Sequence, residues 1–158
     1  MKHEQCVLIA EDNEADVLAL RRAFKQLGVP ALLKVVENGA EVIAYLRGDG
    51  TFEDRARYRF PDLLLLDLKM PGTNGFEVLQ WLRQQDGEIG RLRVVVLTSS
   101  DEIRDVNRAY MLGANSFLTK PLDYAEFKHC IDATMRYWLS LSRAPEPPRQ
   151  TGQIRLPS

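Results

Sequence analysis

The stretch Leu63-Leu64-Leu65-Leu66-Asp67-Leu68 places a single carboxylate at the end of a strongly apolar run. Pro61 stands before the run, and the turn residues Met70-Pro71-Gly72 follow it. A short apolar run with such flanks is typical of a strand buried on both faces of a parallel sheet. Asp67 then lies at the carboxyl end of the strand, where open α/β sheets bind their ligands. An Asp after a strand also commonly begins a turn, so the rest of the chain decides between the two roles.

Apolar runs and helical patterns alternate along the whole chain. We expect strands at 6–10, 32–36, 63–68, 93–97 and 116–119. Apolar residues recur at steps of three and four within 16–27, 38–46, 74–82, 103–110 and 123–141, which predicts five helices. Asn38 and Asn74 each stand three residues before a Glu, as in a capping box that begins a helix. Because connections of helix length require parallel pairing, the alternation predicts one doubly wound α/β domain.

Composition is that of an ordinary single globular domain. The chain has 158 residues, of which 45% are hydrophobic and 27% charged, and this length can bury a core without disulfide or metal staples. The formal net charge of −1 argues against a protein that covers nucleic-acid phosphates, so we expect no nucleic-acid partner. Cys6 and Cys130 lie in apolar segments and are expected to be reduced core thiols. The first apolar run is too short for a signal peptide or a membrane span, so we expect a cytoplasmic protein without membrane contact.

Two segments break the periodic pattern. Residues 47–61 form a charged loop before the central strand, and loops of this length are often functional or mobile. A solvated insertion and a partner-docking loop both remain open for this segment. Residues 143–158 are Pro-rich and aperiodic, which predicts a disordered tail after a domain of residues 1–142. The tail is too short to be a DNA-binding domain.

Each inner strand of the predicted sheet ends in a polar residue. The set comprises Glu11, Asp12, Asp67, Thr98 and Lys120. The fold brings all of them to one edge of the sheet, where three carboxylates repel one another unless a cation is present. An all-oxygen donor set without His or Cys suits Mg²⁺, or Mn²⁺, better than zinc.

This set indicates phosphoryl transfer. Ionised Asp67 can attack a phosphorus atom in line and form an acyl phosphate, with a metal ion neutralising the charge. Lys120 and Thr98 can hold the phosphoryl oxygens by hydrogen bonds. Phosphoryl transfer depends mostly on positioning and electrostatics, so the reaction requires no general base.

The polar set, with Asp67-Leu68-Lys69-Met70-Pro71-Gly72-Thr73-Asn74-Gly75 around the middle acid, resembles the receiver domain of two-component response regulators over about residues 5–142. The resemblance implies a flavodoxin-like sheet of order 2-1-3-4-5 with five helices, and phosphorylation of Asp67 by a sensor histidine kinase. It further implies that Asp12, Asp67 and the backbone carbonyl of Lys69 bind Mg²⁺, with Glu11 acting through water. Lys120 and Pro121 would share a cis peptide bond.

A narrower likeness concerns the partner. The segment Glu11-Asp12-Asn13-Glu14-Ala15-Asp16, the charged insertion and the stand-alone architecture are similar to small regulators paired with bacterial phytochrome-type kinases. The side chain of Lys69 either folds toward the acids or is solvated.

The resemblance also implies how the signal is passed on. Phe117 occupies the position of the family's switching aromatic residue, and we expect it to turn inward when Thr98 moves toward the phosphoryl group. The surface formed by 103–110, 116–119 and 123–141 then changes. We expect a signalling switch and not a turnover enzyme, with a homodimer through the helices at 103–110 and 123–141. Exposed apolar residues such as Tyr137 and Leu139 are otherwise scattered surface.

Three other readings compete with the receiver. A phosphatase of the haloacid dehalogenase class needs a second Asp two residues after Asp67, where this chain has Lys69. A flavodoxin-like cofactor protein needs Gly, Ser or Thr in its first turn, where this chain has the acidic run that begins at Glu11. A phosphorylation-independent adaptor built on a receiver fold remains the alternative.

Overall fold

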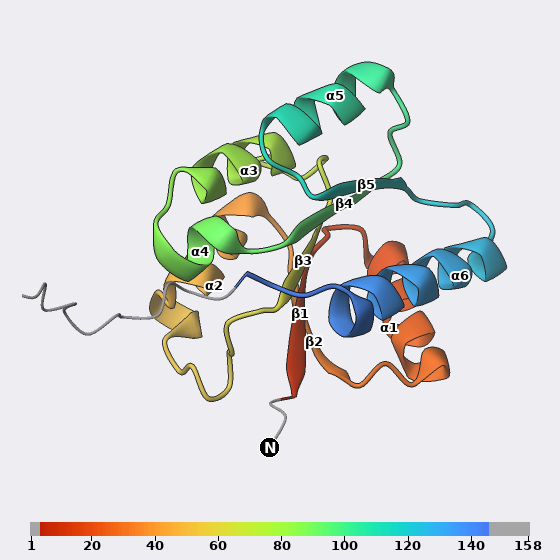
Figure 1. The fold of residues 1–158 in the computed structure, drawn as a ribbon, viewed down its shortest axis with the longest axis horizontal. Helices are drawn as coiled ribbons and strands as arrows, with labels where there is room; N and C mark the ends of the chain where they lie inside the picture. The colour runs from red at the N-terminus through yellow and green to blue at the C-terminus, as the bar shows by residue number, and fades with distance from the viewer. Residues whose placement is uncertain (1–3, 146–158) are drawn as a thin grey trace, which may run out of the picture.

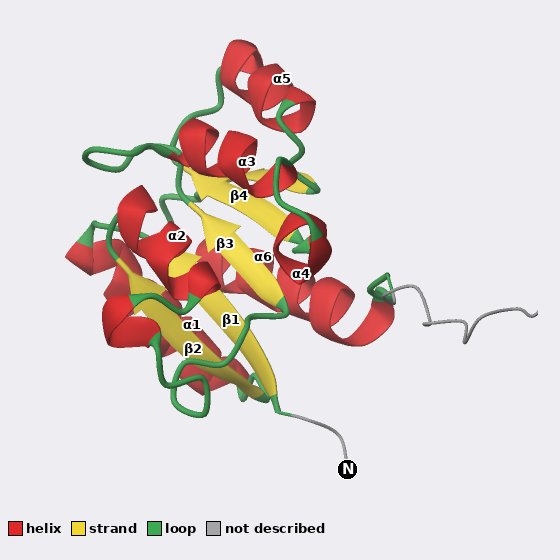
Figure 2. Ribbon diagram, turned by 90° about the vertical axis from the view of Figure 1, so that its left-hand side faces the viewer, coloured by secondary structure: helices red, strands yellow, loops and turns green. Residues whose placement is uncertain are grey.

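A five-stranded parallel sheet forms the centre of the molecule. The computed structural model describes residues 4–145. The strands are β1 (Gln5–Ala10), β2 (Ala31–Val36), β3 (Leu63–Leu66), β4 (Val94–Thr98) and β5 (Ser116–Thr119). Their order is β2-β1-β3-β4-β5, every neighbouring pair is parallel, and Figure 2 shows the arrows running in one direction. The predicted doubly wound, flavodoxin-like topology is confirmed.

Helices cover both faces of the sheet. They are α1 (Glu14–Leu27), α2 (Gly39–Arg47), α3 (Gly75–Arg83), α4 (Gly87–Arg91), α5 (Ile103–Met111) and α6 (Tyr124–Met135), with the 3-10 turn η1 (Gly50–Phe52) and the π-helical η2 (Arg136–Leu141). Figure 1 shows α1 and α6 on one side of the sheet, and α2, α3 and α5 on the other. The five long helices agree with the prediction. The helix expected at 103–110 corresponds to α5, and the helix expected at 123–141 corresponds to α6 together with η2. The pattern missed α4, because five residues are too few to reveal an apolar face.

The leucine run forms the centre of the core. Leu63 and Leu65 pack with α1 and α6, whereas Leu64 and Leu66 face α2, α3 and α5. All four are at most 2% exposed, so the run lacks polar alternation because both faces are covered. Full burial of a leucine side chain contributes about 1.5–3 kcal/mol, and four such side chains hold β3 firmly in place.

Asparagine caps fix where the helices begin beside the sheet edge. Asn13, Asn38 and Asn74 each accept a hydrogen bond from the backbone N–H three residues on, and α3 carries the full capping box. Gly75 begins α3 directly against β3, since a Cβ atom there would lie 2.5 Å from the carbonyl oxygen of Asp67. Only glycine therefore permits α3 to start this close to the end of the central strand.

The charged segment at 47–61 is packed against α2. Arg55 donates to the backbone carbonyls of Tyr45 (2.6 Å) and Phe52 (3.2 Å), and so holds the loop at the end of α2. The rings of Tyr45, Phe52 and Tyr58 contact one another with centroids 5.1 to 6.0 Å apart. The loop is therefore anchored to α2 by this aromatic cluster.

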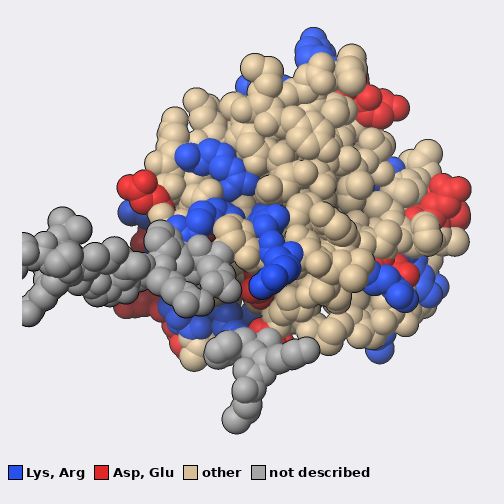
Figure 3. Space-filling model, viewed as in Figure 1, with Lys and Arg blue, Asp and Glu red and all other residues tan. Residues whose placement is uncertain are grey.

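Several smaller predictions concern the surface and the thiols. Cys6 and Cys130 are both free, and Cys6 is buried as expected, whereas Cys130 is only partly buried and does not lie in the core. Within residues 4–145 no helix has the length and apolar character needed to span a membrane. Figure 3 shows both charge signs on the face that it draws, with Lys and Arg gathered near α4. Of the tail predicted at 143–158, residues 146–158 lie outside the described part of the chain.

Candidate functional site

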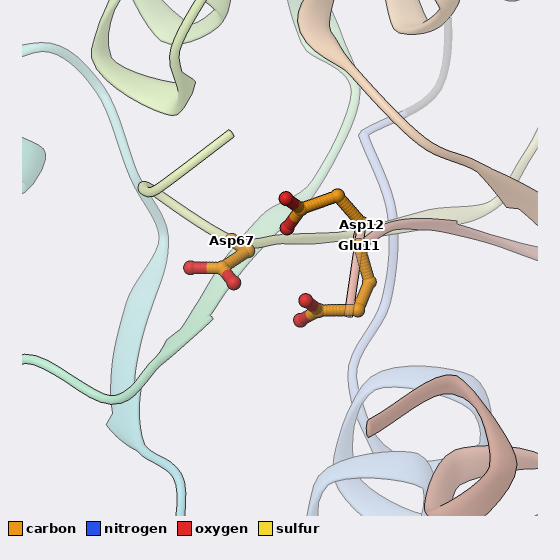
Figure 4. A group of neighbouring side chains, drawn as sticks. All are labelled: Glu11, Asp12 and Asp67. Atoms are coloured by element: carbon orange, nitrogen blue, oxygen red, sulfur yellow. The ribbon is translucent and has the colours of Figure 1, made fainter. Parts of the chain in front are cut away.

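The predicted polar residues meet at the carboxyl edge of the sheet. Glu11 and Asp12 follow β1, Asp67 follows β3, Thr98 ends β4 and Lys120 follows β5. Figure 4 shows the three carboxyl groups gathered together, two from the end of β1 and one from the end of β3. Glu11, Asp67 and Thr98 are buried and Asp12 is exposed, so the group opens to solvent on the side of Asp12.

Hydrogen bonds hold both oxygens of Asp67. Its Oδ1 accepts from the hydroxyl of Thr98 at 2.9 Å and from the backbone N–H of Lys69 at 3.1 Å. Its Oδ2 accepts from Nζ of Lys120 at 3.1 Å. Asp67 is only 7% exposed, and Thr98 is fully buried. The carboxylate therefore has a fixed orientation at the end of a rigid strand.

Lys120 is the positive centre of the site. Its ammonium group donates to Glu11, to Asp16 Oδ2 at 2.8 Å and to Asp67 Oδ2. Three acceptors use all three of its protons. Burial alone would lower the pKa of Lys120, but the hydrogen bonds that Lys120 donates to Asp16 and Glu11 and the charge of Asp67 outweigh burial and raise this pKa. Lys120 therefore remains charged within the acid cluster.

Glu11 is the most constrained of the acids. Its Oε1 accepts from the backbone N–H of Asn13 at 3.0 Å, and its Oε2 accepts from Lys120. Burial raises the pKa of the Glu11 carboxyl to about 7, and the neighbouring charge of Asp67 adds to this rise against the hydrogen bond from Lys120. A cation placed among the acids would favour the ionised form of Glu11.

The acids form a donor set that fits a hard divalent cation. Glu11, Asp12 and Asp67 each offer one oxygen, and these oxygens lie within 4.8 Å of one another. Carboxylate oxygens with access to water are the ligands that Mg²⁺ and Mn²⁺ prefer. Lys69 contributes its backbone N–H to Asp67 and exposes its side chain, whereas the role of its carbonyl stays a prediction.

Two predicted positions lie differently from the rest. Phe117 does not join the acids; it is half-buried on β5, where it packs against the core on the α3 and α5 side. The cis peptide bond predicted between Lys120 and Pro121 is wrong, because no peptide bond within residues 4–145 is cis. The two isomers before a proline differ by only about 0.5–1 kcal/mol, so the dipeptide alone does not decide between them.

The sequence reasoning missed Asp16. This residue lies in the first turn of α1, where an acidic side chain commonly interacts favourably with the positive end of the helix dipole. That ordinary explanation hides its contact with Lys120, which is 104 positions away along the chain. The available signal was the position of Asp16 near the end of β1, on the same edge as the other acids.

Comparisons with known proteins identify one matching family and several relatives. The model of the response regulator receiver domain family matches residues 7–132. The probable methanogenesis regulatory protein FilR2 of Methanothrix harundinacea is 33% identical over 141 residues, which span 89% of this chain and 88% of FilR2. Response regulator Rcp1 of Synechocystis is 31% identical over 139 residues, spanning 88% of this chain and 92% of Rcp1.

Solved structures of related proteins have the same fold. The phosphorylated cyanobacterial phytochrome response regulator RcpA superposes with a TM-score of 0.83 at 31% identity, covering 91% of this chain and 100% of RcpA. The Mn²⁺-bound form of Rcp1 superposes with a TM-score of 0.79 at 30% identity, covering 90% of this chain and 99% of Rcp1. At these identities and coverages the likeness extends to sequence as well as to fold.

Proposed function

The chain belongs to the response regulator receiver family, and on this premise we propose that Asp67 accepts a phosphoryl group from the phosphohistidine of a sensor histidine kinase. Receiver domains are the signalling switches of two-component systems, and the relatives of this chain include phytochrome response regulators. The observation that carries the proposal is a buried carboxylate, Asp67, with donors on both oxygens at the end of the central strand. We propose residues 1–142 as the receiver domain.

The transfer needs little covalent chemistry from the protein. An oxygen of Asp67 attacks phosphorus while the phosphorus–nitrogen bond of the phosphohistidine breaks, and the leaving imidazole keeps the electron pair. The product is an acyl phosphate on Asp67. Because an ionised carboxylate has no proton to lose, no general base takes part. Thr98 and Lys120 already contact the two oxygens of Asp67, so short movements bring their protons to the phosphoryl oxygens.

A divalent cation fits this proposal. Asp12, Asp67 and the backbone carbonyl of Lys69 would hold Mg²⁺, or Mn²⁺, with Glu11 acting through water. The ion would neutralise negative charge on the carboxylate and the phosphoryl group. The Mn²⁺-bound form of Rcp1 supports a metal of this class. Lys120 also offsets the charge of two of these acids, through its ion pairs with Glu11 and Asp67.

We propose that Thr98 and Phe117 convert phosphorylation into a change of surface. Thr98 moves its hydroxyl from Asp67 to a phosphoryl oxygen, and Phe117 turns inward on β5. The backbone N–H of Phe117 donates to the hydroxyl of Tyr110 at 3.1 Å, which links β5 to α5. A nearly complete change of state needs roughly 5.5 kcal/mol. Hydrogen bonds to a charged group contribute about 1.5–3 kcal/mol each, so a few new bonds suffice.

The proposed output is the face formed by α5, β5 and α6. Large apolar side chains are exposed there, including Ile103 (71%), Met111 (87%) and Leu122 (105%). We propose that this face forms a homodimer through α5 and α6 after phosphorylation. Light scattering with and without a phosphoryl donor measures the mass directly, and an unchanged monomer would remove the dimer from the proposal.

A mass measurement tests the central reaction. The protein is incubated with MgCl₂ and phosphoramidate, and intact mass spectrometry should show one added phosphoryl group. Asp67→Asn should show none, whereas Asp101→Asn removes an exposed acid after β4 and should behave like wild type. An adaptor that works without phosphorylation would show no mass gain in any of the three proteins.

The partner is tested by phosphotransfer. We propose a phytochrome-type histidine kinase, since RcpA and Rcp1 are similar to this chain over nearly their whole length. A panel of autophosphorylated kinases is mixed with the protein, and loss of label from the kinase is followed over seconds. Faster transfer from kinases without a phytochrome sensor would contradict this choice. Cytoplasmic localisation and the absence of nucleic-acid and membrane partners stay predictions.

A further inference from the structure

A residue outside the expected receiver set contacts the lysine of the site. We propose that Asp16 is a positioning residue, which gives Lys120 a carboxylate partner outside the metal-binding acids and so lets Lys120 release Glu11 and Asp67 when a divalent cation binds. This inference rests on the proposed function, because it concerns the metal that the phosphoryl transfer requires. It is carried by the ion pair between Asp16 Oδ2 and Lys120 Nζ at 2.8 Å.

The start of α1 explains why the Asp16 side chain is free to reach Lys120. In a capping box, the side chain three residues after the cap bonds back to the N–H of the capping residue. Glu77 does this for Asn74 at the start of α3. In α1 the N–H of Asn13 instead donates to Glu11 Oε1 at 3.0 Å, while Asn13 caps the backbone N–H of Asp16. The Asp16 side chain therefore does not bond to the capping residue, and its carboxylate accepts a hydrogen bond from Lys120 instead.

The three partners of Lys120 are not equivalent. Glu11 and Asp67 belong to the group of acids whose oxygens could hold a metal, and Asp16 does not. The side chains of Glu11 and Asp67 are 3% and 8% exposed, whereas that of Asp16 is 38% exposed. Asp16 is thus the one partner that Lys120 can keep when a cation approaches the other two.

Lys120 and a divalent cation compete for the same negative charge. With Asp16 present, Lys120 can shift toward it when the cation binds, so the ammonium group keeps a carboxylate partner. Without Asp16, the cation must displace a nearly buried ammonium group that has no remaining carboxylate to pair with. Loss of Asp16 should therefore weaken cation binding by roughly fivefold or more. Fivefold is about the smallest change in affinity that one coupled site usually causes at another.

Isothermal titration calorimetry with MgCl₂, and separately with MnCl₂, tests this role in the full-length protein. Asp16→Asn should raise the dissociation constant by about fivefold or more, and Asp16→Glu, which restores the carboxylate, should stay within about twofold of wild type. Glu14→Gln is the matched control, because it removes one charge from the same turn of α1. Glu14 is exposed and forms no ion pair within residues 4–145, so it should also stay within about twofold.

Two results would overturn the inference. One is an equal weakening in Asp16→Asn and Glu14→Gln, which would mean that net charge alone matters. The other is failure of Asp16→Glu to restore binding while circular dichroism shows the variant folded. If wild type binds neither cation, the proposed function fails together with this inference. If wild type binds Mg²⁺ and is phosphorylated while Asp16→Asn binds as tightly, only the role of Asp16 fails.

Discussion

Replacing Asp12 by asparagine should stabilise the metal-free protein and at the same time remove its stabilisation by Mg²⁺. Oxygens of Asp12, Glu11 and Asp67 lie within 4.8 Å of one another. At that separation two unit charges repel by about 0.9 kcal/mol in water and by about 3.5 kcal/mol at an effective dielectric constant near 20. Asp12 is exposed, so the smaller value applies. Lys120 offsets one of the two neighbouring charges, which leaves a net gain of about 1 kcal/mol for Asp12→Asn.

The assay is urea unfolding followed by far-UV circular dichroism at pH 8, where Glu11 is ionised, because burial raises its pKa only to about 7. In EDTA, Asp12→Asn should unfold at higher urea than wild type. In MgCl₂ at about 100 times the dissociation constant, wild type should gain about 2.7 kcal/mol, whereas the variant, which lacks one carboxylate ligand, should gain far less. The order of stability should therefore reverse between the two buffers.

Glu126→Gln is the control for this experiment. It removes one exposed charge from the first turn of α6, away from the acids, and should change the free energy of unfolding by less than about 0.5 kcal/mol in either buffer. The reasoning is refuted if Asp12→Asn is less stable than wild type in EDTA, or if it gains as much from Mg²⁺ as wild type does.

Two further predictions concern the acid site, and a third concerns the hydrogen bonds of Arg83 at the end of α3. Thr98→Val keeps the shape but removes the donor at 2.9 Å from Asp67, so urea unfolding should show a loss of about 1.5–3 kcal/mol, and a change under 0.5 kcal/mol would contradict the bond. Because the pKa of Glu11 is raised from 4.5 to about 7, the folded protein binds its proton more tightly than the unfolded chain, and stability in EDTA should fall as pH rises from 4.5 to 7. Glu11→Gln should flatten that dependence, and an unchanged slope would assign it to other groups. Arg83 donates to the carbonyls of Gly113 (2.8 Å), Gly90 (2.9 Å) and Leu92 (2.8 Å), so Arg83→Met should lower the free energy of unfolding by roughly 2–3 kcal/mol, with Arg83→Lys recovering only part, as thermal unfolding would show.

Local patterns predicted most of the architecture. The strands are mostly apolar runs, most clearly β1, β3 and β4, and each long helix has a repeat of three and four. Both patterns can be read without knowing which elements touch. The polar residues at the strand ends were predicted to meet, because parallel strands bring their carboxyl ends to one edge. The short helix α4 was missed, since its five residues carry no readable period.

The contacts of individual side chains were not readable in the same way. Asp16 has the residue type and the position of an ordinary acid in the first turn of a helix. Its contact with Lys120 could not be read from the pattern, because Lys120 is 104 residues away along the chain. The isomer before Pro121 was predicted wrongly, because a difference of about 0.5–1 kcal/mol is smaller than what packing can impose.

By itself, the sequence determined a buried central strand that ends in Asp67 and the set of polar residues that the parallel sheet gathers around it. Those features depend on periodicity and on the order of elements, which are properties of the chain. Tertiary structure decided how Lys120 divides its three protons among Glu11, Asp16 and Asp67, and it raised the pKa of Glu11. These properties depend on burial and on distances between elements far apart in the chain, and only the packed fold sets them.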